Sequence, residues 1–235
     1  RVKGGTLADQ RVLFLGAGSA GIGIANLIAS GMELEGLSTE EARARISLFD
    51  INGLLEPSRT DLFDFQAPYA HDHAPETDLV KAIESLKPTV LIGVSTKGRA
   101  FTQQVVEAMA KLNDRPVIFA LSNPTDHAEC TAEQAYRWSR GKALFAAGVP
   151  FPPVVVDGKS FDPGQGNNLY VFPAIGLAVY ATVASRVTDE MFIAAAKGVA
   201  DLVTDEQLAL GLLYPPQNDI LKTEIAVAAR VAEVI

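Results

Sequence analysis

The sequence lacks the cysteines for an internal disulfide, because Cys130 is its single cysteine. A lone thiol is typical of a protein from a reducing compartment, so we expect a cytoplasmic location. One histidine, His127, lies near Cys130 in sequence, which is too little to indicate a catalytic thiol. We therefore interpret Cys130 as a small buried residue at the start of a helix.

The sequence also lacks a membrane-spanning apolar run and an excess of basic charge. Its longest apolar stretch, residues 170–184, has 15 residues and contains Pro173 and Gly176, whereas a spanning helix needs about 20. The formal net charge is −8, with 20 Lys and Arg against 28 Asp and Glu. Without a broad basic face, neither nucleic acid nor an anionic membrane surface is expected as a partner.

What the sequence does have is the composition of a folded globular protein. Its 235 residues are 48% hydrophobic and 20% charged, which is enough for a substantial hydrophobic core. No low-complexity linker divides the sequence. We therefore interpret residues 1–235 as one domain.

The most informative pattern is a glycine-rich turn between an apolar strand and an apolar helix. Residues 12–15 predict the strand, Gly16, Gly18 and Gly21 form a G-x-G-x-x-G pattern, and a helix follows from about Ser19. The first glycine permits the tight bend, the second lets backbone approach a pyrophosphate, and the third lets the helix pack closely on the sheet. The phosphates then bind the free N–H groups and the positive dipole end of the helix. We predict a dinucleotide site here, with a purely structural turn as the alternative.

A site of this kind needs an acidic residue at the end of the second strand, where it accepts hydrogen bonds from ribose hydroxyls. Asp50 ends the apolar segment 46–50. It follows the last glycine of the turn by 29 residues, more than the usual spacing of about 20. A short extra helix over 39–45, started by the capping box of Ser38 and Glu41, explains the surplus. Asp50 is the candidate ribose ligand, and a solvated carboxylate is the alternative.

Further strand and helix signals alternate along the chain, as in a parallel sheet covered by helices on both faces. The predicted strands are 89–94, 117–121 and 143–146, the predicted helices between them are 78–86, 102–112 and 131–139, and C-terminal helices follow over 174–185, 189–203 and 219–235. The fold class is therefore α/β, a doubly wound and mostly parallel sheet with C-terminal helices. Ligands of such folds collect beyond the carboxyl ends of the strands.

Three segments follow predicted strands at that edge of the sheet. Residues 93–98 have small side chains that would let a nucleotide ribose pass close to the backbone. Asn123 directly precedes a proline, which disfavours helical backbone at Asn123 and holds its amide at a strand end. Residues 148–168 are predicted to form a long loop, which ends in Asn167 and Asn168 behind two glycines.

These segments together resemble the NAD-binding domain of malic enzymes. The resemblance rests on residues 15–25, Phe49-Asp50, 91–95, 119–125, 129–133 and 164–168, with Leu213-Tyr214-Pro215-Pro216 near the end of the sequence. It covers nearly the whole chain. No single motif is specific to that family, but the combination is.

The resemblance implies a Rossmann-type NAD(P)-binding fold, a homo-oligomer, and oxidative decarboxylation of L-malate to pyruvate and carbon dioxide. NAD would accept the hydride, and Mg or Mn would act as Lewis acid. The site residues that it implies are Gly16, Ala17, Gly18, Ser19, Ala20 and Gly21 for the pyrophosphate, Asp50 for the ribose, Val94, Ser95 and Thr96 along the nucleotide path, Asn123 near nicotinamide and malate, and one of Asn167 and Asn168 for malate.

The residues around Asp50 favour NAD over NADP. A 2′-phosphate needs a cation and no adjacent carboxylate, yet the strand ends in Asp50 followed by Ile51 and Asn52. Malic enzymes that use NADP often have a lysine in the following loop, and the matching position here is Gln66. Arg59 lies in the same loop and within reach of a 2′-phosphate, so NADP is the alternative.

The resemblance also implies residues that this sequence does not supply. In malic enzymes the metal-binding carboxylates and the acid–base tyrosine and lysine precede the glycine turn, where this sequence has a single acid, Asp9. We therefore expect the cofactor domain of a longer enzyme, binding NAD without turnover and holding no metal. The string His71-Asp72-His73 resembles a metal site, but no further ligand accompanies it, so we interpret it as a solvated loop.

Two alternatives to the malic enzyme reaction stay open. A malolactic enzyme, which converts malate to lactate with NAD bound, would share the same motifs. A non-catalytic dinucleotide-sensing module would need only the glycine turn and its acidic partner.

Overall fold

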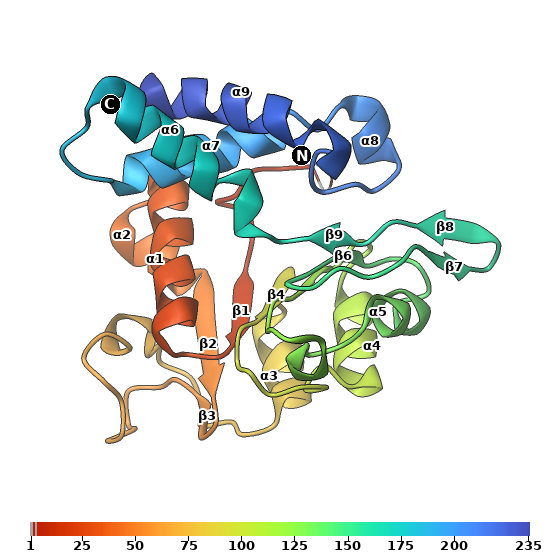
Figure 1. The fold of residues 1–235 in the computed structure, drawn as a ribbon. Helices are drawn as coiled ribbons and strands as arrows, with labels where there is room; N and C mark the ends of the chain where they lie inside the picture. The colour runs from red at the N-terminus through yellow and green to blue at the C-terminus, as the bar shows by residue number, and fades with distance from the viewer. Residues whose placement is uncertain (1, 3) are drawn as a thin grey trace. The chain divides into compact units, whose positions relative to one another are not determined.

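The computed structural model describes residue 2 and residues 4–235, and these fall into two compact units (Figure 1). One unit runs to Pro163, and the other runs from Gly164 to Ile235 and includes Val2. The hydrophobic cores respect this division, because each cluster of buried apolar residues lies within one unit. That the two units form one domain stays a prediction.

The unit that ends at Pro163 is built on a sheet whose strands run in the order β3-β2-β1-β4-β5-β6. The strands are β1 (Val12–Leu15), β2 (Ile46–Asp50), β3 (Gly53–Leu54), β4 (Val90–Gly93), β5 (Val117–Ala120) and β6 (Leu144–Ala147). Their pairing is parallel, except that β3 runs antiparallel to β2. The chain turns outward in both directions from β1, so the junction of β1 and β4 is a topological switch point.

Helices cover both faces of this sheet. They are α1 (Ser19–Leu34), α2 (Thr39–Ala44), α3 (Leu79–Leu86), α4 (Gln103–Leu112) and α5 (Ala132–Trp138). Successive side chains of β1 enter different cores: Val12 and Phe14 pack with α1 and α2, whereas Leu13 and Leu15 pack with α3, α4 and α5. Figure 1 shows these two groups of helices on opposite sides of β1. The predicted doubly wound α/β fold is confirmed.

Side-chain caps start the short helices α2 and α5. The Ser38 hydroxyl accepts a hydrogen bond from the Glu41 N–H at 3.2 Å, and the Glu41 carboxylate accepts one from the Ser38 N–H at 2.8 Å. Thr131 forms the same kind of box with Gln134 at the start of α5. The extra helix before β2 is thus confirmed, and it accounts for the long spacing between the glycine turn and Asp50.

The prediction of a continuous loop over 148–168 is wrong for residues 154–161. This segment contains an antiparallel hairpin of β7 (Val154–Val156) and β8 (Lys159–Phe161). Asp157 and Gly158 form the turn, with φ of 50° and 78°, and positive φ at both central residues is typical of two-residue hairpins.

The unit that begins at Gly164 is helical. It contains β9 (Gly164–Gln165), the 3₁₀ turn η3 (Asn168–Tyr170) and the helices α6 (Phe172–Thr182), α7 (Asp189–Asp201), α8 (Asp205–Ala209) and α9 (Ile220–Ala232). Helices α6, α7 and α9 bury their apolar residues against one another, with Ala174, Ala195 and Val227 fully buried. The predicted C-terminal helices are confirmed, and α8 is an additional one. No helix in the described part of the chain has both the length and the apolar character for crossing a membrane.

Candidate dinucleotide site

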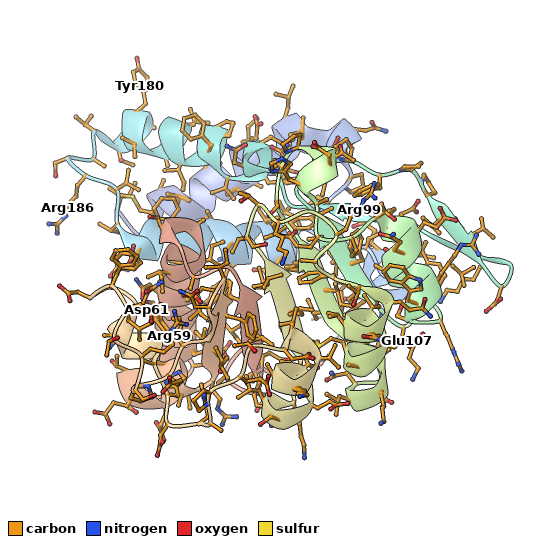
Figure 2. All side chains as sticks on the ribbon, turned by 90° about the horizontal axis from the view of Figure 1, so that it is seen from below. Arg59, Asp61, Arg99, Glu107, Tyr180 and Arg186 are labelled. Carbon is orange, nitrogen blue, oxygen red and sulfur yellow. The ribbon has the colours of Figure 1, made fainter. Side chains whose placement is uncertain are left out.

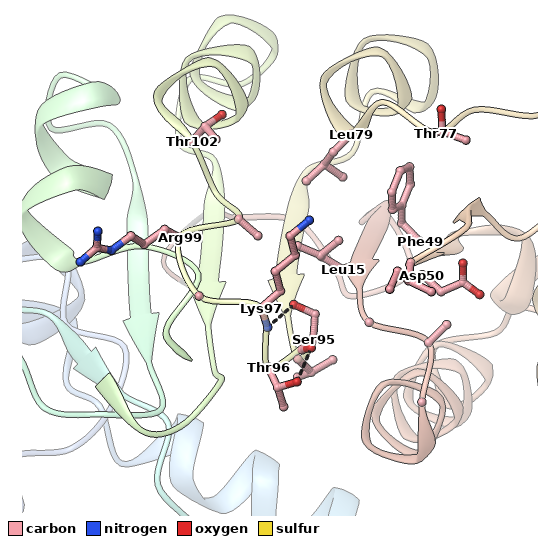
Figure 3. Close-up of a pocket in the computed structure, with 17 residues that line it drawn as sticks. Leu15, Phe49, Asp50, Thr77, Leu79, Ser95, Thr96, Lys97, Arg99 and Thr102 are labelled. Carbon is pink, nitrogen blue, oxygen red and sulfur yellow. Dashed lines mark hydrogen bonds between the residues drawn. The ribbon is translucent and has the colours of Figure 1, made fainter. Parts of the chain in front are cut away.

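A pocket of about 610 Å³ opens at the carboxyl ends of β1, β2 and β4, at the switch point of the sheet (Figure 3). The predicted site residues that line it are Gly16, Ala17, Gly18, Asp50, Val94, Ser95 and Thr96. Figure 3 shows Asp50 at the end of β2 on one side of the pocket, and Ser95, Thr96 and Lys97 in the loop after β4. The structure therefore brings the glycine turn, the acidic residue and the predicted nucleotide path together.

Each glycine of the turn is required for a different physical reason. Gly16 has φ of 121°, and a Cβ there would lie 2.7 Å from the Val94 carbonyl oxygen. A Cβ on Gly21 would collide with the Gly16 carbonyl oxygen, because α1 packs directly on the turn. A Cβ on Gly18 would meet no heavy atom of the described residues within 4 Å. Gly16 and Gly21 therefore shape the turn, whereas Gly18 leaves it open toward the pocket.

The N-terminus of α1 is available to an anion. Gly18 precedes the helix in extended backbone, and no side chain within the described residues caps it. Gly18, Ser19 and Ala20 are exposed. The N–H groups of a first helical turn have no partner inside the helix, and the helix dipole adds a partial positive charge there. This geometry fits the pyrophosphate of a dinucleotide.

Asp50 is held by an arginine that follows it in the chain. Arg59 donates from Nη1 to Oδ1 at 3.0 Å and from Nη2 to Oδ2 at 2.8 Å, a bidentate ion pair. The Asn52 backbone N–H donates to Oδ1 at 2.8 Å. The Asp50 side chain is 18% exposed, and that of Arg59 is 10% exposed. The carboxylate that would bind the ribose is therefore preorganised beside a cation.

A second carboxylate binds the same guanidinium. Asp61 accepts from Arg59 Nε at 3.0 Å and from Nη2 at 2.6 Å, and Figure 2 shows these two side chains together. The hydrogen bonds from Arg59, with a further one from Asn52, hold the pKa of Asp61 below its ordinary value. The hydrogen bonds that Arg59 donates to Asp61 and to Asp50 raise the pKa of Arg59. Arg59 is thus held between the side chains of Asp50 and Asp61, an arrangement that we call the Arg59 clamp.

Gln66 occupies the position where the resemblance expects the lysine of NADP users. Its side chain is buried, and Nε2 donates to the Ala17 carbonyl oxygen at 2.8 Å. Its Oε1 accepts from the Phe63 N–H at 3.0 Å. The residue thus fastens its loop to the glycine turn, and it brings no charge to the site.

Sequence reasoning missed the role of Glu129, which is fully buried beneath the nucleotide path. Its carboxylate accepts a hydrogen bond from the Ser122 hydroxyl at 2.5 Å and from the Ser95 N–H at 3.3 Å. The Thr96 N–H in turn donates to the Ser122 hydroxyl oxygen at 3.0 Å. Glu129 therefore joins the ends of β4 and β5. The nearest signal in the sequence is that Glu129 begins segment 129–133, one of the segments on which the family resemblance rests.

The predicted amide ligands lie elsewhere. Asn123 is exposed beyond the end of β5, before a cis peptide bond to Pro124, and is not in the lining of the pocket. Asn167 and Asn168 belong to the other unit. The Asn167 side chain caps η3 by accepting from the Leu169 N–H at 3.0 Å, whereas Asn168 is exposed. The ligand roles of these amides stay predictions.

The metal-like string at 71–73 is only partly a solvated loop, so that interpretation is wrong for its histidines. His71 Nε2 lies 2.8 Å from the Ile46 carbonyl oxygen. Both ring nitrogens of His73 are buried, and burial lowers its pKa. Asp72 is exposed. Among residues 2 and 4–235, no group of three His, Cys, Asp or Glu side chains could hold a metal ion.

A doubly wound sheet whose switch point carries an open glycine turn, an uncapped helix and an acidic strand end defines a dinucleotide-binding domain of the Rossmann type. The family model described as "Malic enzyme, NAD binding domain" matches residues 1–235. The chain belongs to the malic enzyme family.

Named relatives agree with this assignment. The chain is 52% identical to an NADP-dependent malic enzyme of Vitis vinifera and to NADP-dependent malic enzyme 3 of Arabidopsis thaliana, over 99% and 98% of its length. It is 50% identical to the chloroplastic NADP-dependent malic enzyme 4 of Arabidopsis thaliana, over 99% of its length and 36% of that protein. It spans about 40% of the length of the first two relatives. Because these relatives are named for NADP, the preference for NAD is not confirmed.

Proposed function

We propose that this chain is the dinucleotide-binding part of an enzyme that oxidises and decarboxylates L-malate to pyruvate and carbon dioxide. Membership of the malic enzyme family supports the reaction. The observation that carries the binding proposal is one pocket holding both the open glycine turn and Asp50. A nicotinamide dinucleotide bound there would supply the hydride acceptor.

The residues of this chain would bind and orient the two ligands. The turn from Gly16 to Gly21 would bind the pyrophosphate through backbone N–H groups, and Asp50 would accept hydrogen bonds from the adenosine ribose. The loop from Val94 to Thr96 would border the nucleotide, with Glu129 fixing its position from below. For malate the family resemblance supports Asn123 and one of Asn167 and Asn168 as amide ligands; the Asn167 side-chain oxygen also accepts a hydrogen bond from the Leu169 N–H.

The family resemblance implies Mg or Mn in the intact enzyme. The described residues do not fit such a centre, because they contain no group of three possible ligands. No step of the reaction is therefore assigned to a metal held by this chain.

For the cofactor we propose NAD. Asp50, Arg59 and Asp61 together carry one net negative charge, and Gln66 adds no positive charge. A phosphate monoester at neutral pH carries about −1.5 to −2 charges, so a 2′-phosphate would be repelled by this group. NADP is the second candidate, favoured by the names of the relatives and by the guanidinium that lies 2.8 Å from Asp50.

Calorimetric titration of the chain with NAD and with NADP tests the binding proposal. We expect NAD to bind, and Asp50→Ala to weaken it by about ten- to a hundredfold, which corresponds to about 1.5–3 kcal/mol for hydrogen bonds to a charged group. Asp64→Ala, which removes an exposed acid of the following loop, is the control. Unchanged affinity in Asp50→Ala would remove Asp50 from the site, and binding of neither dinucleotide would overturn the proposal.

Product analysis tests the reaction. The protein is assayed with malate and NAD in the longest form that its gene encodes. Pyruvate with NADH supports oxidative decarboxylation, whereas lactate without net NADH identifies a malolactic enzyme. Dinucleotide binding with neither product identifies a sensing module.

We also propose a homo-oligomer and a cytoplasmic location. The family resemblance supports the oligomer, and the single, buried thiol supports the location. One relative is named chloroplastic, so fractionation of the source cells is the direct test of location. Light scattering on the purified protein tests the oligomer.

A further inference from the structure

The donors of the Arg59 guanidinium are fully engaged. Nη1 bonds to Asp50 and to the carbonyl oxygens of Gly53 and Leu54 at 3.2 and 3.4 Å. Nη2 bonds to both acids, and Nε bonds to Asp61. A guanidinium has five N–H donors in a fixed fork. With two carboxylates on two of its edges, Arg59 has no free edge for a phosphate.

Asp61 is itself held in this arrangement. The Asn52 amide donates from Nδ2 to Asp61 Oδ2 at 2.8 Å, and the backbone N–H of the same asparagine donates to Asp50. The Asp61 side chain is 45% exposed, more than its two partners in the clamp. Asp61 is therefore the more exposed of the two acids that bind Arg59. Asp50 is the one that lines the dinucleotide pocket.

Space beside the clamp is sufficient for an extra phosphate. A second pocket of about 330 Å³ is lined by Asn52, Arg59, Asp61 and Thr77, and Thr77 also lines the dinucleotide pocket. Two further acids, at positions 56 and 76, line this second pocket. A 2′-phosphate would therefore be excluded by charge and by the lack of a free guanidinium edge, rather than by lack of room.

We propose that Asp61 is a specificity-determining residue, which selects NAD against NADP by occupying the edge of Arg59 that would otherwise bind a 2′-phosphate. The inference rests on the proposed dinucleotide site. Asp61 acts through Arg59 and is a positioning residue. Bidentate Arg–phosphate pairs are strong and geometrically specific, so freeing one edge of Arg59 changes the affinity for NADP far more than that for NAD.

The test is calorimetric titration of the chain with NAD and NADP for wild type, Asp61→Asn, Asp61→Glu and Asp64→Asn. Asp61→Asn removes one negative charge at constant shape, and we expect about tenfold tighter NADP binding with NAD affinity changed by less than threefold. Asp61→Glu keeps the charge and should keep the NAD preference. Asp64→Asn removes the same charge from an exposed position in the same loop and should leave both affinities unchanged.

A double variant, Asp61→Asn with Arg59→Gln, tests whether the effect passes through Arg59. The gain in NADP affinity should disappear in it, and in the single variant the gain should shrink as salt is added. Three results would each overturn the proposal. They are a gain in NADP affinity in Asp61→Asn no larger than in Asp64→Asn, a gain that survives in the double variant, and an equal loss of affinity for both dinucleotides.

Titration of the wild-type protein distinguishes failure of the specificity role of Asp61 from failure of the proposed dinucleotide site. Tighter binding of NADP than of NAD by wild type would overturn the role of Asp61 and leave the dinucleotide site intact. Binding of neither dinucleotide by wild type would refute the site and the specificity role together. Thermal melts of every variant show whether a lost affinity reflects lost folding.

Discussion

Gly18 and Gly21 are three residues apart, yet a methyl group would affect them in opposite ways. At Gly18 the φ angle is −80°, and a Cβ would point into open space. We expect Gly18→Ala to keep the free energy of unfolding within about 0.5 kcal/mol of wild type. The added methyl group would hold the pyrophosphate away from the backbone, so NAD affinity should fall about tenfold. Urea denaturation and calorimetry measure the two quantities.

Gly23 and Gly21, which lie within α1, are matched controls for Gly18 at its N-terminus. Gly23→Ala also places its Cβ in open space, but beyond the first turn, so it should raise helix stability without changing NAD affinity. Gly21→Ala should instead lower stability by about 1–3 kcal/mol, because its Cβ collides with backbone of the turn. A Gly18→Ala variant that unfolds like Gly21→Ala would contradict the assigned roles.

Cys130 is predicted to be chemically inert in the folded protein. Its side chain is 1% exposed, and burial, with a smaller effect of Glu129, raises the pKa of the thiol well above its usual range. The thiolate is the reactive form, so a raised pKa leaves less of it at neutral pH. An aromatic disulfide reagent should label the thiol only after denaturant is added. Labelling within seconds in native buffer would place Cys130 at the surface.

At the scale of single elements, α5 depends on its N-cap. The Thr131 hydroxyl accepts from the Gln134 N–H at 3.2 Å, and the Gln134 side chain accepts from the Thr131 N–H at 2.9 Å. Thr131→Ala should lower the free energy of unfolding by about 1 kcal/mol, whereas Thr131→Ser keeps the hydroxyl and should lose much less. Denaturant titration distinguishes the two, and equal losses would show that the threonine methyl, rather than the cap, matters.

Elements were predictable from sequence where their signals are local. The capping box of Ser38 and Glu41 acts across three residues, so the sequence shows it complete. The hairpin of β7 and β8 is absent from the predicted elements although its signal is equally local: Asp157-Gly158, a dipeptide typical of two-residue hairpin turns, directly follows Val154-Val155-Val156. Pro152, Pro153 and Pro163 flank the hairpin, and prolines are typical of loops, so the local signals conflict.

The sequence predicts which residues of the site lie at strand ends, but not the side-chain contacts between distant segments. The glycine turn and Asp50 follow from strand ends, but the clamp on Arg59 depends on how a loop folds back nine residues after Asp50. The carboxylate of Glu129 reaches Ser95 across 34 residues. Such contacts depend on tertiary packing that no local pattern encodes, and they decide which of the candidate side chains are free to meet a ligand.

At the scale of the whole molecule, the separation of the hydrophobic cores is the main organising feature. The two clusters that sandwich the sheet draw on residues from Val12 to Phe161. The third draws on residues from Leu169 to Ala232, and its stacked Tyr170 and Tyr214 rings lie 5.4 Å apart. Because buried apolar contact supplies most of the folding free energy, each unit has its own source of stability.

We therefore expect a chain shortened to residues 4–163 to fold and to keep the NAD affinity of the longer chain within about threefold. Every residue that lines the dinucleotide pocket lies between Leu15 and Thr102, within the cores that the shortened chain retains. Thermal unfolding followed by circular dichroism and calorimetric titration with NAD test this expectation. The Asp50→Ala variant of the shortened chain serves as a control for specific binding. A cooperative melt without NAD binding would contradict this expectation, because it would show that the pocket residues of the shortened chain do not suffice for NAD binding.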